Sequence, residues 1–213
     1  MSGGEVARRV AALYPTRFLR SYVRWKVALD PVYGAVLQRL TGGRIVDVGC
    51  GAGVLAAYLR ARGLGAVVDG IDHDPRKIAV AQQLGIPDAT FRVAGANDEI
   101  DLRGTVVILD VLHDLDDAAR ASLLQRAAAA ADMVIIRDAV RDGSLRYRLT
   151  FAQEELARLV RWLRTDRLLF PSRDAIAGAF AGFDAEIVPM WGRMPFNNYL
   201  FVFRRSSAGM TKP

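Results

Sequence analysis

The feature that most constrains this chain is residues 44–53, where three alternating glycines directly follow a short apolar run. Ile45, Val46 and Val48 predict a short buried β-strand, and the apolar segment 54–62 after the glycines predicts a helix. Glycine lets the backbone turn tightly and lets a ligand approach with no Cβ in the way. The first N–H groups of a helix lack partners within the helix and favour anionic groups. The segment therefore predicts a site for an anionic or polar ligand.

The spacing of the glycines narrows the class of site. In the dinucleotide fingerprint G-x-G-x-x-G the third glycine is the sixth residue, whereas here Gly53 comes one residue earlier and Val54 stands in its place. Asp47 stands two residues before the first glycine. The string Asp-Val-Gly-Cys-Gly-Ala-Gly resembles motif I of the class I S-adenosylmethionine (SAM)-dependent methyltransferases. A nucleotide-binding Rossmann variant is the alternative.

The resemblance covers about residues 40–203 and implies a fold, a cofactor and contacts. The fold would be α/β, a doubly wound, seven-stranded, Rossmann-like sheet in the order 3-2-1-4-5-7-6 with strand 7 antiparallel. The cofactor would be SAM and the product S-adenosylhomocysteine. The turn residues expected to bind the cofactor are Asp47, Gly49, Cys50, Gly51 and Gly53.

Periodicity and turn residues predict strands that alternate with helices, followed by a closing strand pair, which is typical of a doubly wound sheet. The expected strands are 45–48, 66–71, 90–93, 105–109, 133–136, 185–188 and 199–203. The expected helices are 5–13, 17–29, 31–40, 54–62, 75–84, a helix that ends near 131, 149–163 and 173–180. The expected N-caps are Thr16, Asp74, either Asp116 or Asp117, and Ser172. We divide the chain into an N-terminal helical region that covers the substrate (1–40), a SAM-binding α/β domain (41–204) and a disordered tail (205–213), with no second globular domain.

Composition limits the compartment and the chemistry. Hydrophobic residues make up 52% of the 213 residues, which is enough for a core. No apolar run reaches the 18 or so residues of a membrane span, and the first residues lack the apolar segment of a signal peptide. The single cysteine, Cys50, fits a cytoplasmic protein and has a packing role in a turn that needs a small residue. One cysteine and two histidines predict no metal site.

Two further stretches are expected to contact the cofactor. Asp72 ends the second strand 19 residues after Gly53, where an acidic residue accepts hydrogen bonds from ribose hydroxyls. The adjacent His73 is expected at the adenine edge or in solvent. In the family, the loop after the third strand often carries an acidic residue directly after a glycine to hold the adenine amino group. Here that position is Ala96. Asn97 or Asp98 would therefore have to hold the adenine amino group instead.

The fourth strand ends in Leu-Asp-Val-Leu-His, which resembles motif IV, where the strand end faces both methyl donor and acceptor. Asp110 and His113 are therefore the catalytic candidates, with Asp110 also expected to touch the cofactor. The alternatives are a carboxylate that braces the loop and an imidazole that packs. Arg137 and Asp138, after the fifth strand, are expected at the carboxyl edge of the sheet, where open α/β sheets bind ligands. We expect Arg137 to contact the acceptor there.

An aromatic stripe precedes the glycine turn. Phe18, Tyr22, Trp25 and Leu29 recur at helical spacing, and Arg24 lies among them. We expect Tyr22, Arg24 and Trp25 to contact the acceptor; the alternative is that the stripe is core packing. The net charge is +6, and residues 1–44 hold eight basic residues against two acidic ones. Such a face suits an acidic carrier protein or an anionic membrane surface, with nucleic acid less favoured, unless it is simply solvated.

These features together predict in-line methyl transfer to a small-molecule or carrier-bound aryl or acyl acceptor, with positioning as the main catalytic contribution. A carbon acceptor would also need a base. The segment 24–31, the motif IV string and the turn 195–198 resemble small bacterial methyltransferases of aryl-polyene and fatty-acid-type biosynthesis. The alternatives are an RNA methyltransferase and a non-catalytic SAM-binding or partner-binding protein.

Overall fold

The computed structural model describes residues 1–159, 169–191 and 196–206. The chain forms two compact units, Met1–Asp98 and Glu99–Pro213. Numbered along the chain, the strands follow the order 3-2-1-4-5-7-6 in the sheet, and the seventh runs antiparallel to both of its neighbours. This confirms the predicted α/β fold class and strand order.

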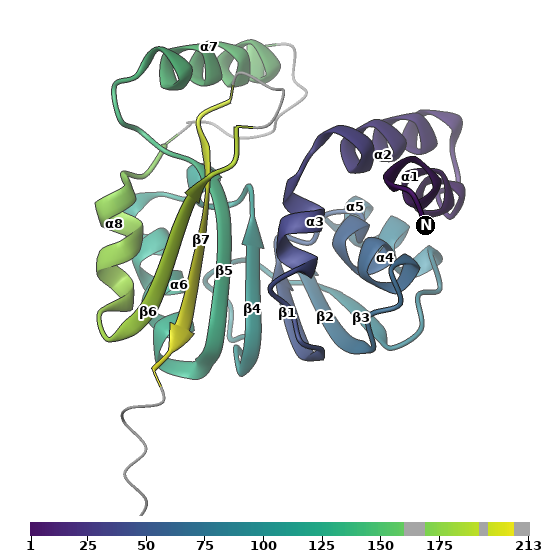
Figure 1. The fold of residues 1–213 in the computed structure, drawn as a ribbon, viewed down its shortest axis with the longest axis horizontal. Helices are drawn as coiled ribbons and strands as arrows, with labels where there is room; N and C mark the ends of the chain where they lie inside the picture. Colours follow the sequence, from purple (N-terminus) through teal and green to yellow (C-terminus); the bar gives the residue numbers. More distant parts are fainter. Residues whose placement is uncertain (160–168, 192–195, 207–213) are drawn as a thin grey trace, which may run out of the picture. The chain divides into compact units, whose positions relative to one another are not determined.

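The first unit contains five helices and three parallel strands among its described residues (Figure 1). Its elements are α1 (Gly3–Ala12), α2 (Arg17–Leu29), α3 (Val32–Leu37), β1 (Gly43–Val48), α4 (Val54–Ala61), β2 (Ala66–Asp72), α5 (Pro75–Gln83) and β3 (Ala89–Val93). Helices α1 and α2 lie side by side, and α1 also contacts α4. The N-terminal helices thus belong to the same compact unit as the glycine turn, and the division of the chain at residue 40 stays a prediction.

The described part of the second unit holds four more strands and the elements between them. These are β4 (Gly104–Leu109), the 3₁₀ turn η1 (Leu112–Asp114), α6 (Asp117–Ala130), β5 (Ala131–Ala139), α7 (Leu145–Leu159), α8 (Arg173–Ala177), η2 (Gly178–Phe180), β6 (Phe183–Pro189) and β7 (Asn198–Arg205). The middle of β4 and β5 is fully buried, as continuous apolar runs in a parallel pair should be.

The predicted helix starts are set by side chains that accept a hydrogen bond from the first turn. Thr16, Asp74, Asp116 and Ser172 each cap the helix that follows. Such a cap satisfies an N–H that the helix itself cannot.

Several predicted boundaries differ from the structure. Strand β5 continues to Ala139, so Arg137 and Asp138 lie within it and not beyond its end. Helix α7 begins at Leu145, four residues before the prediction, and residues 160–163 lie outside the described part. Strand β7 includes Arg205, which the sequence pattern assigns to the tail; Pro195 and residues 207–213 are outside the description.

The face that helix α2 buries is not the aromatic stripe, as it would be if the stripe were core packing. Its buried residues are Val23 and Val27. Phe18 and Trp25 keep 61% and 62% of their surface exposed. The alternative that the aromatic stripe is core packing is therefore wrong.

None of the described helices is both long and apolar enough to cross a bilayer.

Candidate cofactor and active site

The glycine turn between β1 and α4 adopts backbone angles that favour glycine. Gly49, Gly51 and Gly53 have φ of 75°, 55° and 75°. The N–H groups of Gly49 and Cys50 donate to the carbonyl oxygen of Ile71, at 2.8 and 2.9 Å. The turn is thus held from its side by the end of β2, and left-handed angles that other residues adopt at a cost explain why glycine recurs there.

Gly53 and Gly51 have different structural roles. A Cβ on Gly53 would lie 3.1 Å from Phe91 Cζ and 3.2 Å from Ala81 Cβ, so glycine there allows close packing. A Cβ on Gly51 would meet nothing within 4 Å. The space beside Gly51 is therefore open, as a bound ligand would require.

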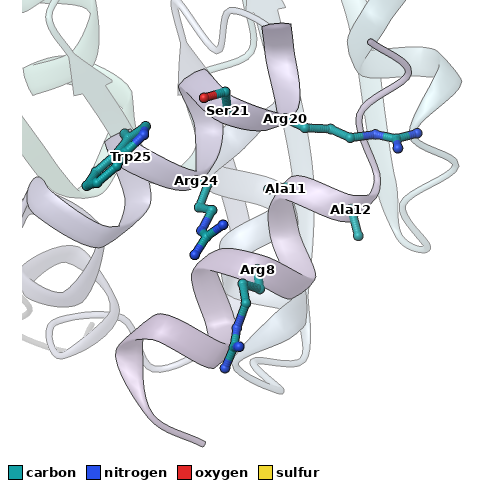
Figure 2. Close-up of a pocket in the computed structure, with 7 residues that line it drawn as sticks. All are labelled: Arg8, Ala11, Ala12, Arg20, Ser21, Arg24 and Trp25. Carbon is teal, nitrogen blue, oxygen red and sulfur yellow. The ribbon is translucent and has the colours of Figure 1, made fainter. Parts of the chain in front are cut away.

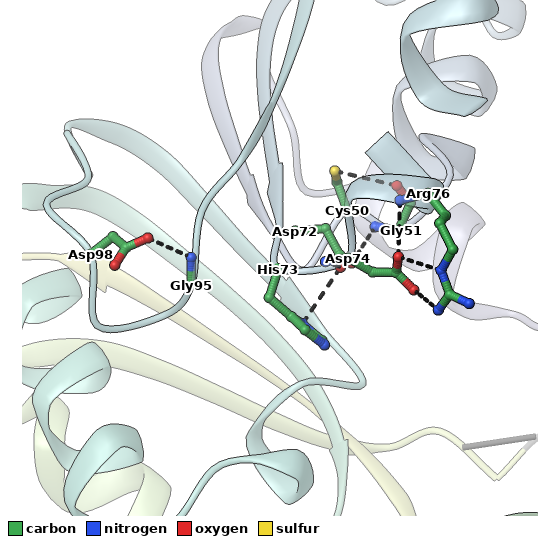
Figure 3. A network of polar contacts seen from close by, with 8 residues as sticks. All are labelled: Cys50, Gly51, Asp72, His73, Asp74, Arg76, Gly95 and Asp98. Atoms are coloured by element: carbon green, nitrogen blue, oxygen red, sulfur yellow. Dashed lines mark hydrogen bonds and ion pairs between the residues drawn. The ribbon is translucent and has the colours of Figure 1, made fainter. Parts of the chain in front are cut away.

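Asp72 connects this turn to the end of β2. Its Oδ2 accepts a hydrogen bond from the Gly51 N–H at 2.9 Å, and its Oδ1 accepts one from the Asp74 N–H at 2.8 Å (Figure 3). Each carboxylate oxygen can accept more than one hydrogen bond. Asp72 can therefore shape the turn and still accept hydroxyl donors. The adjacent His73 lies 3.5 Å from Asp72 Oδ1, with 74% of its side chain exposed, as expected for a solvent-facing imidazole.

Asp47 is a buried carboxylate at the end of β1. Its Oδ2 has no hydrogen-bond partner within the described residues, and the residue is only 2% exposed. Burial, followed by the charge of Asp72, raises the pKa of Asp47 to about 7. An orphaned buried acceptor is uncommon. Together with the open space at Gly51, this group fits a ligand that brings its own N–H or O–H donors.

Cys50 lies within the turn but is not exposed. Burial raises the pKa of its thiol well above the ordinary value, and the nearby Asp47 and Asp72 charges raise it further. Its Sγ would lie 3.0 Å from a Cβ at Gly70. A neutral buried thiol against the neighbouring strand supports the expected packing role.

The loop after β3 contains a carboxylate that is bonded to the backbone of the same loop. Asp98 Oδ2 accepts a hydrogen bond from the Gly95 N–H at 2.8 Å, which closes the loop on itself (Figure 3). Asn97 is exposed and Ala96 is half-buried. A contact between this loop and an adenine stays a prediction for Ala96 and Asn97.

In the second unit, Asp138 organises the segment that follows β4. Its carboxylate is fully buried and accepts from His113 Nδ1 at 2.7 Å, from the Leu112 N–H at 2.7 Å and from the Ala139 N–H at 2.8 Å. The sequence pattern places Asp138 only at the sheet edge. The histidine 25 residues earlier is the one signal in the sequence of a partner for it.

The charge of His113 follows from this contact. Burial lowers the pKa of His113, but the charge of Asp138 and the hydrogen bond to it outweigh burial, and Asp114 and Asp110 add to their effect. The pKa of His113 is thereby raised to about 10. Near neutral pH the imidazole is protonated and has no lone pair to offer. The contact with Asp138 thus favours a packing role for His113 over a role as general base.

This ion pair predicts a pH dependence of stability. The folded pKa of His113, about 10, exceeds the unfolded value of about 6.5, so the folded state binds the extra proton. Its stabilisation is complete below about pH 6.5 and is lost as the pH rises toward 10. Urea midpoints of the wild type should fall across this window, and those of His113→Gln should fall less. Parallel curves would contradict the assignment.

Aromatic rings and an arginine surround His113. The ring of Phe170 stacks on the imidazole, with centroids 5.4 Å apart, and Tyr147 meets Phe170 edge-on at 5.9 Å. Arg120 Nη1 donates to the carbonyl oxygens of Leu112 and Leu169, at 3.2 and 2.6 Å. These contacts hold η1 against the segment that precedes α8.

Asp110 follows β4 in a left-handed conformation, with φ of 58°. Its Oδ1 lies 2.7 Å from Nη1 of Arg137, and its N–H donates to the Arg137 carbonyl oxygen at 2.9 Å. A non-glycine residue at positive φ is uncommon, and such strain often accompanies functional sites. The expected acceptor contact, Arg137, is buried and ion-paired to the expected catalytic carboxylate. Contacts of either with cofactor or acceptor stay predictions.

Tyr14 makes a contact with the glycine turn that the sequence pattern did not predict. It follows α1, is fully buried, and donates from its hydroxyl to the carbonyl oxygen of Ala52 at 3.0 Å. Arg20 Nε in turn donates to the Tyr14 carbonyl oxygen at 2.6 Å. The N-terminal helices are therefore attached directly to the glycine turn. Tyr22 and Trp25, by contrast, are exposed on α2, and their contact with an acceptor stays a prediction.

Among the described residues, no group of three or more His, Cys, Asp and Glu side chains could hold a metal ion.

The sheet order and the strand–glycine turn–helix site, with Asp72 at the end of the next strand, are those of the class I SAM-dependent methyltransferase fold. The family model of the methyltransferase domain matches residues 21–189, and the chain belongs to this family.

Curated relatives match over short segments. Trans-aconitate 2-methyltransferase of Mycobacterium tuberculosis is 49% identical over 47 residues, which are 22% of this chain and 18% of that protein. Ubiquinone biosynthesis O-methyltransferase of Paracidovorax citrulli is 34% identical over 91 residues, covering 39% of this chain and 37% of the relative. The match thus spans much less than half of each relative.

One solved structure covers nearly the whole chain. Magnesium protoporphyrin IX methyltransferase from Synechocystis, with bound S-adenosylhomocysteine, superposes with a TM-score of 0.64 at 22% identity. It covers 96% of this chain and 94% of its own. At this identity the likeness shows the fold.

Proposed function

We propose that this chain transfers the methyl group of SAM to an oxygen atom of a small-molecule or carrier-bound aryl or acyl acceptor that is already ionised near neutral pH. The observation that carries the proposal is the glycine turn with Asp72, where the space beside Gly51 is open and Asp47 keeps a buried acceptor free. The curated relatives are named as methyltransferases, and one is named as an O-methyltransferase.

The residues of the first unit would hold the cofactor. Asp72 would accept hydrogen bonds from ribose hydroxyls, and the backbone around Gly51 would lie against the ligand where no side chain intervenes. Bound SAM supplies an activated methyl group on a sulfonium. What the chain must add is position and exclusion of water. Tyr14 supports this by fixing the N-terminal helices to Ala52, beside the turn.

The choice of an ionised oxygen follows from the state of the candidate bases. His113 is protonated and bound to Asp138, and Asp110 is ion-paired to Arg137. Neither is a ready acceptor for a proton, so a nucleophile that needs deprotonation is poorly served by these two residues. A carboxylate or an acidic phenol needs no base. We therefore assign Asp110 and His113 to bracing the loop after β4.

Asp72 provides a direct test of cofactor binding. Two ribose hydrogen bonds to a charged acceptor, each worth roughly 1.5–3 kcal/mol before compensation, should be lost in Asp72→Ala. Calorimetry should then show SAM binding weakened by at least tenfold, partly because the Gly51 N–H also loses its acceptor. The control is Asp74→Ala, which removes the cap of α5 next to it and should leave SAM affinity within about twofold. Equal effects of both changes would mean that the ribose is held elsewhere.

Transfer itself can be tested without knowing the acceptor. The wild type would be incubated with methyl-labelled SAM and separately with aryl and acyl carboxylic acids, phenols, carrier-bound acyl groups and RNA. We expect label in acids or phenols, as products that base hydrolysis or ether cleavage identifies. Label in RNA instead would favour a nucleic-acid methyltransferase. Tight SAM binding with no transfer to any fraction would favour the non-catalytic alternative.

A further inference from the structure

Helix α2 carries two apolar stripes on opposite faces. Val23 and Val27 form the buried stripe. The exposed stripe contains four large side chains that recur every three or four residues: Phe18, Tyr22, Trp25 and Leu29. A helix whose exposed face carries large apolar side chains has a surface suited to another apolar phase.

A basic groove flanks this stripe. Between α1 and α2 lies a groove of about 400 Å³ whose lining includes Arg8, Arg20, Arg24 and Trp25 (Figure 2). The side chains of Arg8 and Arg24 extend in the same direction, one from each helix. All lining residues lie in the described part of the chain, and none of them is a carboxylate. The groove therefore combines an aromatic edge with concentrated positive charge.

The surrounding sequence does not neutralise that charge. Residues 1–44 hold eight basic residues, while their two acidic residues lie at the margins, Glu5 in the first turn of α1 and Asp30 at the C-cap of α2. Arginine pairs with phosphate oxygens in a bidentate manner and keeps its charge at any physiological pH. Aromatic side chains favour the boundary between water and acyl chains.

We propose that the exposed face of α2, together with the arginine groove, docks this protein on an anionic lipid bilayer. Phe18, Tyr22, Trp25 and Leu29 enter the headgroup boundary, and Arg8 and Arg24 bind lipid phosphates. This is the pattern of an amphipathic helix that lies in the plane of the interface. The inference goes beyond the proposed function and does not depend on it.

The dimensions of α2 favour a bilayer over a folded protein as the occupant. Its 13 residues form a face about 20 Å long. A stable protein interface buries about 800 Å² on each partner, which is more than one face of a 13-residue helix offers. A bilayer requires no complementary shape, only apolar side chains at one depth and basic groups at the phosphates.

The test is sedimentation of the full chain with vesicles. We expect the wild type to bind vesicles of equal parts phosphatidylcholine and phosphatidylglycerol, to bind pure phosphatidylcholine at least tenfold more weakly, and to be released by salt. Phe18→Ser/Trp25→Ser and Arg8→Gln/Arg24→Gln should each lower the binding by about tenfold or more. SAM calorimetry on each variant shows that its first unit remains folded.

Matched controls change the same chemistry at other exposed positions. Arg62→Gln/Arg92→Gln removes the same charge from the first unit, and Leu145→Ser/Ile187→Ser removes exposed apolar side chains from the second. Both should bind vesicles as the wild type does. Loss of binding in the controls, or unchanged binding in the α2 variants, would overturn the proposal. So would a wild type that ignores the vesicles but binds polyglutamate, or one that dimerises through Phe18 and Trp25; those results would identify an acidic protein or a second copy as the occupant.

Discussion

Gly51→Val should abolish measurable SAM binding while the protein remains folded. The side chain would enter the open space beside the turn, where no described atom lies within 4 Å of the position that a Cβ would take. The proposed function places the cofactor in that space. Calorimetry should show at least a hundredfold loss of affinity, since a branched side chain cannot withdraw from a turn whose N–H is bound to Asp72.

The left-handed backbone complicates this test, and the chain provides a matched control. Valine at φ of 55° carries a strain of roughly 1–2 kcal/mol. Gly85 has φ of 58° and also has nothing within 4 Å of its Cβ position, but it lies after α5 and away from the turn. Gly85→Val should therefore cost similar stability and leave SAM affinity unchanged. If Gly51→Val retains affinity, or if both variants lose it equally, the turn is not the cofactor site.

Asp138→Ala should be the most destabilising single change in the second unit. The fully buried carboxylate accepts three hydrogen bonds, and its loss leaves a buried imidazolium and two backbone N–H groups without their partner. Breaking a buried ion pair from one side costs about 3–5 kcal/mol. Urea denaturation should show a loss of this size.

The control for this change lies on the same strand. Asp132 is exposed near the start of β5, and Asp132→Ala should change stability by less than about 0.5 kcal/mol. A small effect at both positions would mean that Asp138 does not organise the segment after β4. A large loss at Asp138 that His113→Gln fully reproduces would assign the effect to the ion pair and not to the backbone donors.

The fold was predictable because its signals are local. Apolar runs bounded by glycine located the strands, and capping residues such as Thr16 and Asp74 located helix starts, since each cap acts within three residues of its own position. The motif I resemblance then supplied the strand order, which no local signal contains. Boundaries failed where a charged residue is buried: Arg137 and Asp138 look like a strand end, but β5 continues through them.

The site was only partly predictable because its key contacts join distant residues. Asp138 binds His113 across 25 positions and Tyr14 reaches Ala52 across 38, and neither pair leaves a periodic trace. In helix α2 the face that packs against the core was not predictable. Both apolar stripes have the same helical period, so the pattern alone could not reveal that Val23 and Val27 face the core and the larger aromatic residues do not.

The position of Phe91 has a consequence for how this sequence can evolve. Its ring lies 3.1 Å from a Cβ at Gly53 and 2.6 Å from a Cβ at Gly70, so one side chain excludes larger residues at two sites on different elements. A Cβ at Gly70 would also lie 3.0 Å from Cys50 Sγ, but the shorter contact is with Phe91. A larger residue at position 70 therefore requires that residue 91 first become smaller, because the opposite order of changes creates a clash. At Gly53 the backbone angle adds its own barrier. Related sequences that lack glycine at position 70 of β2 should therefore carry a residue smaller than phenylalanine at position 91 of β3.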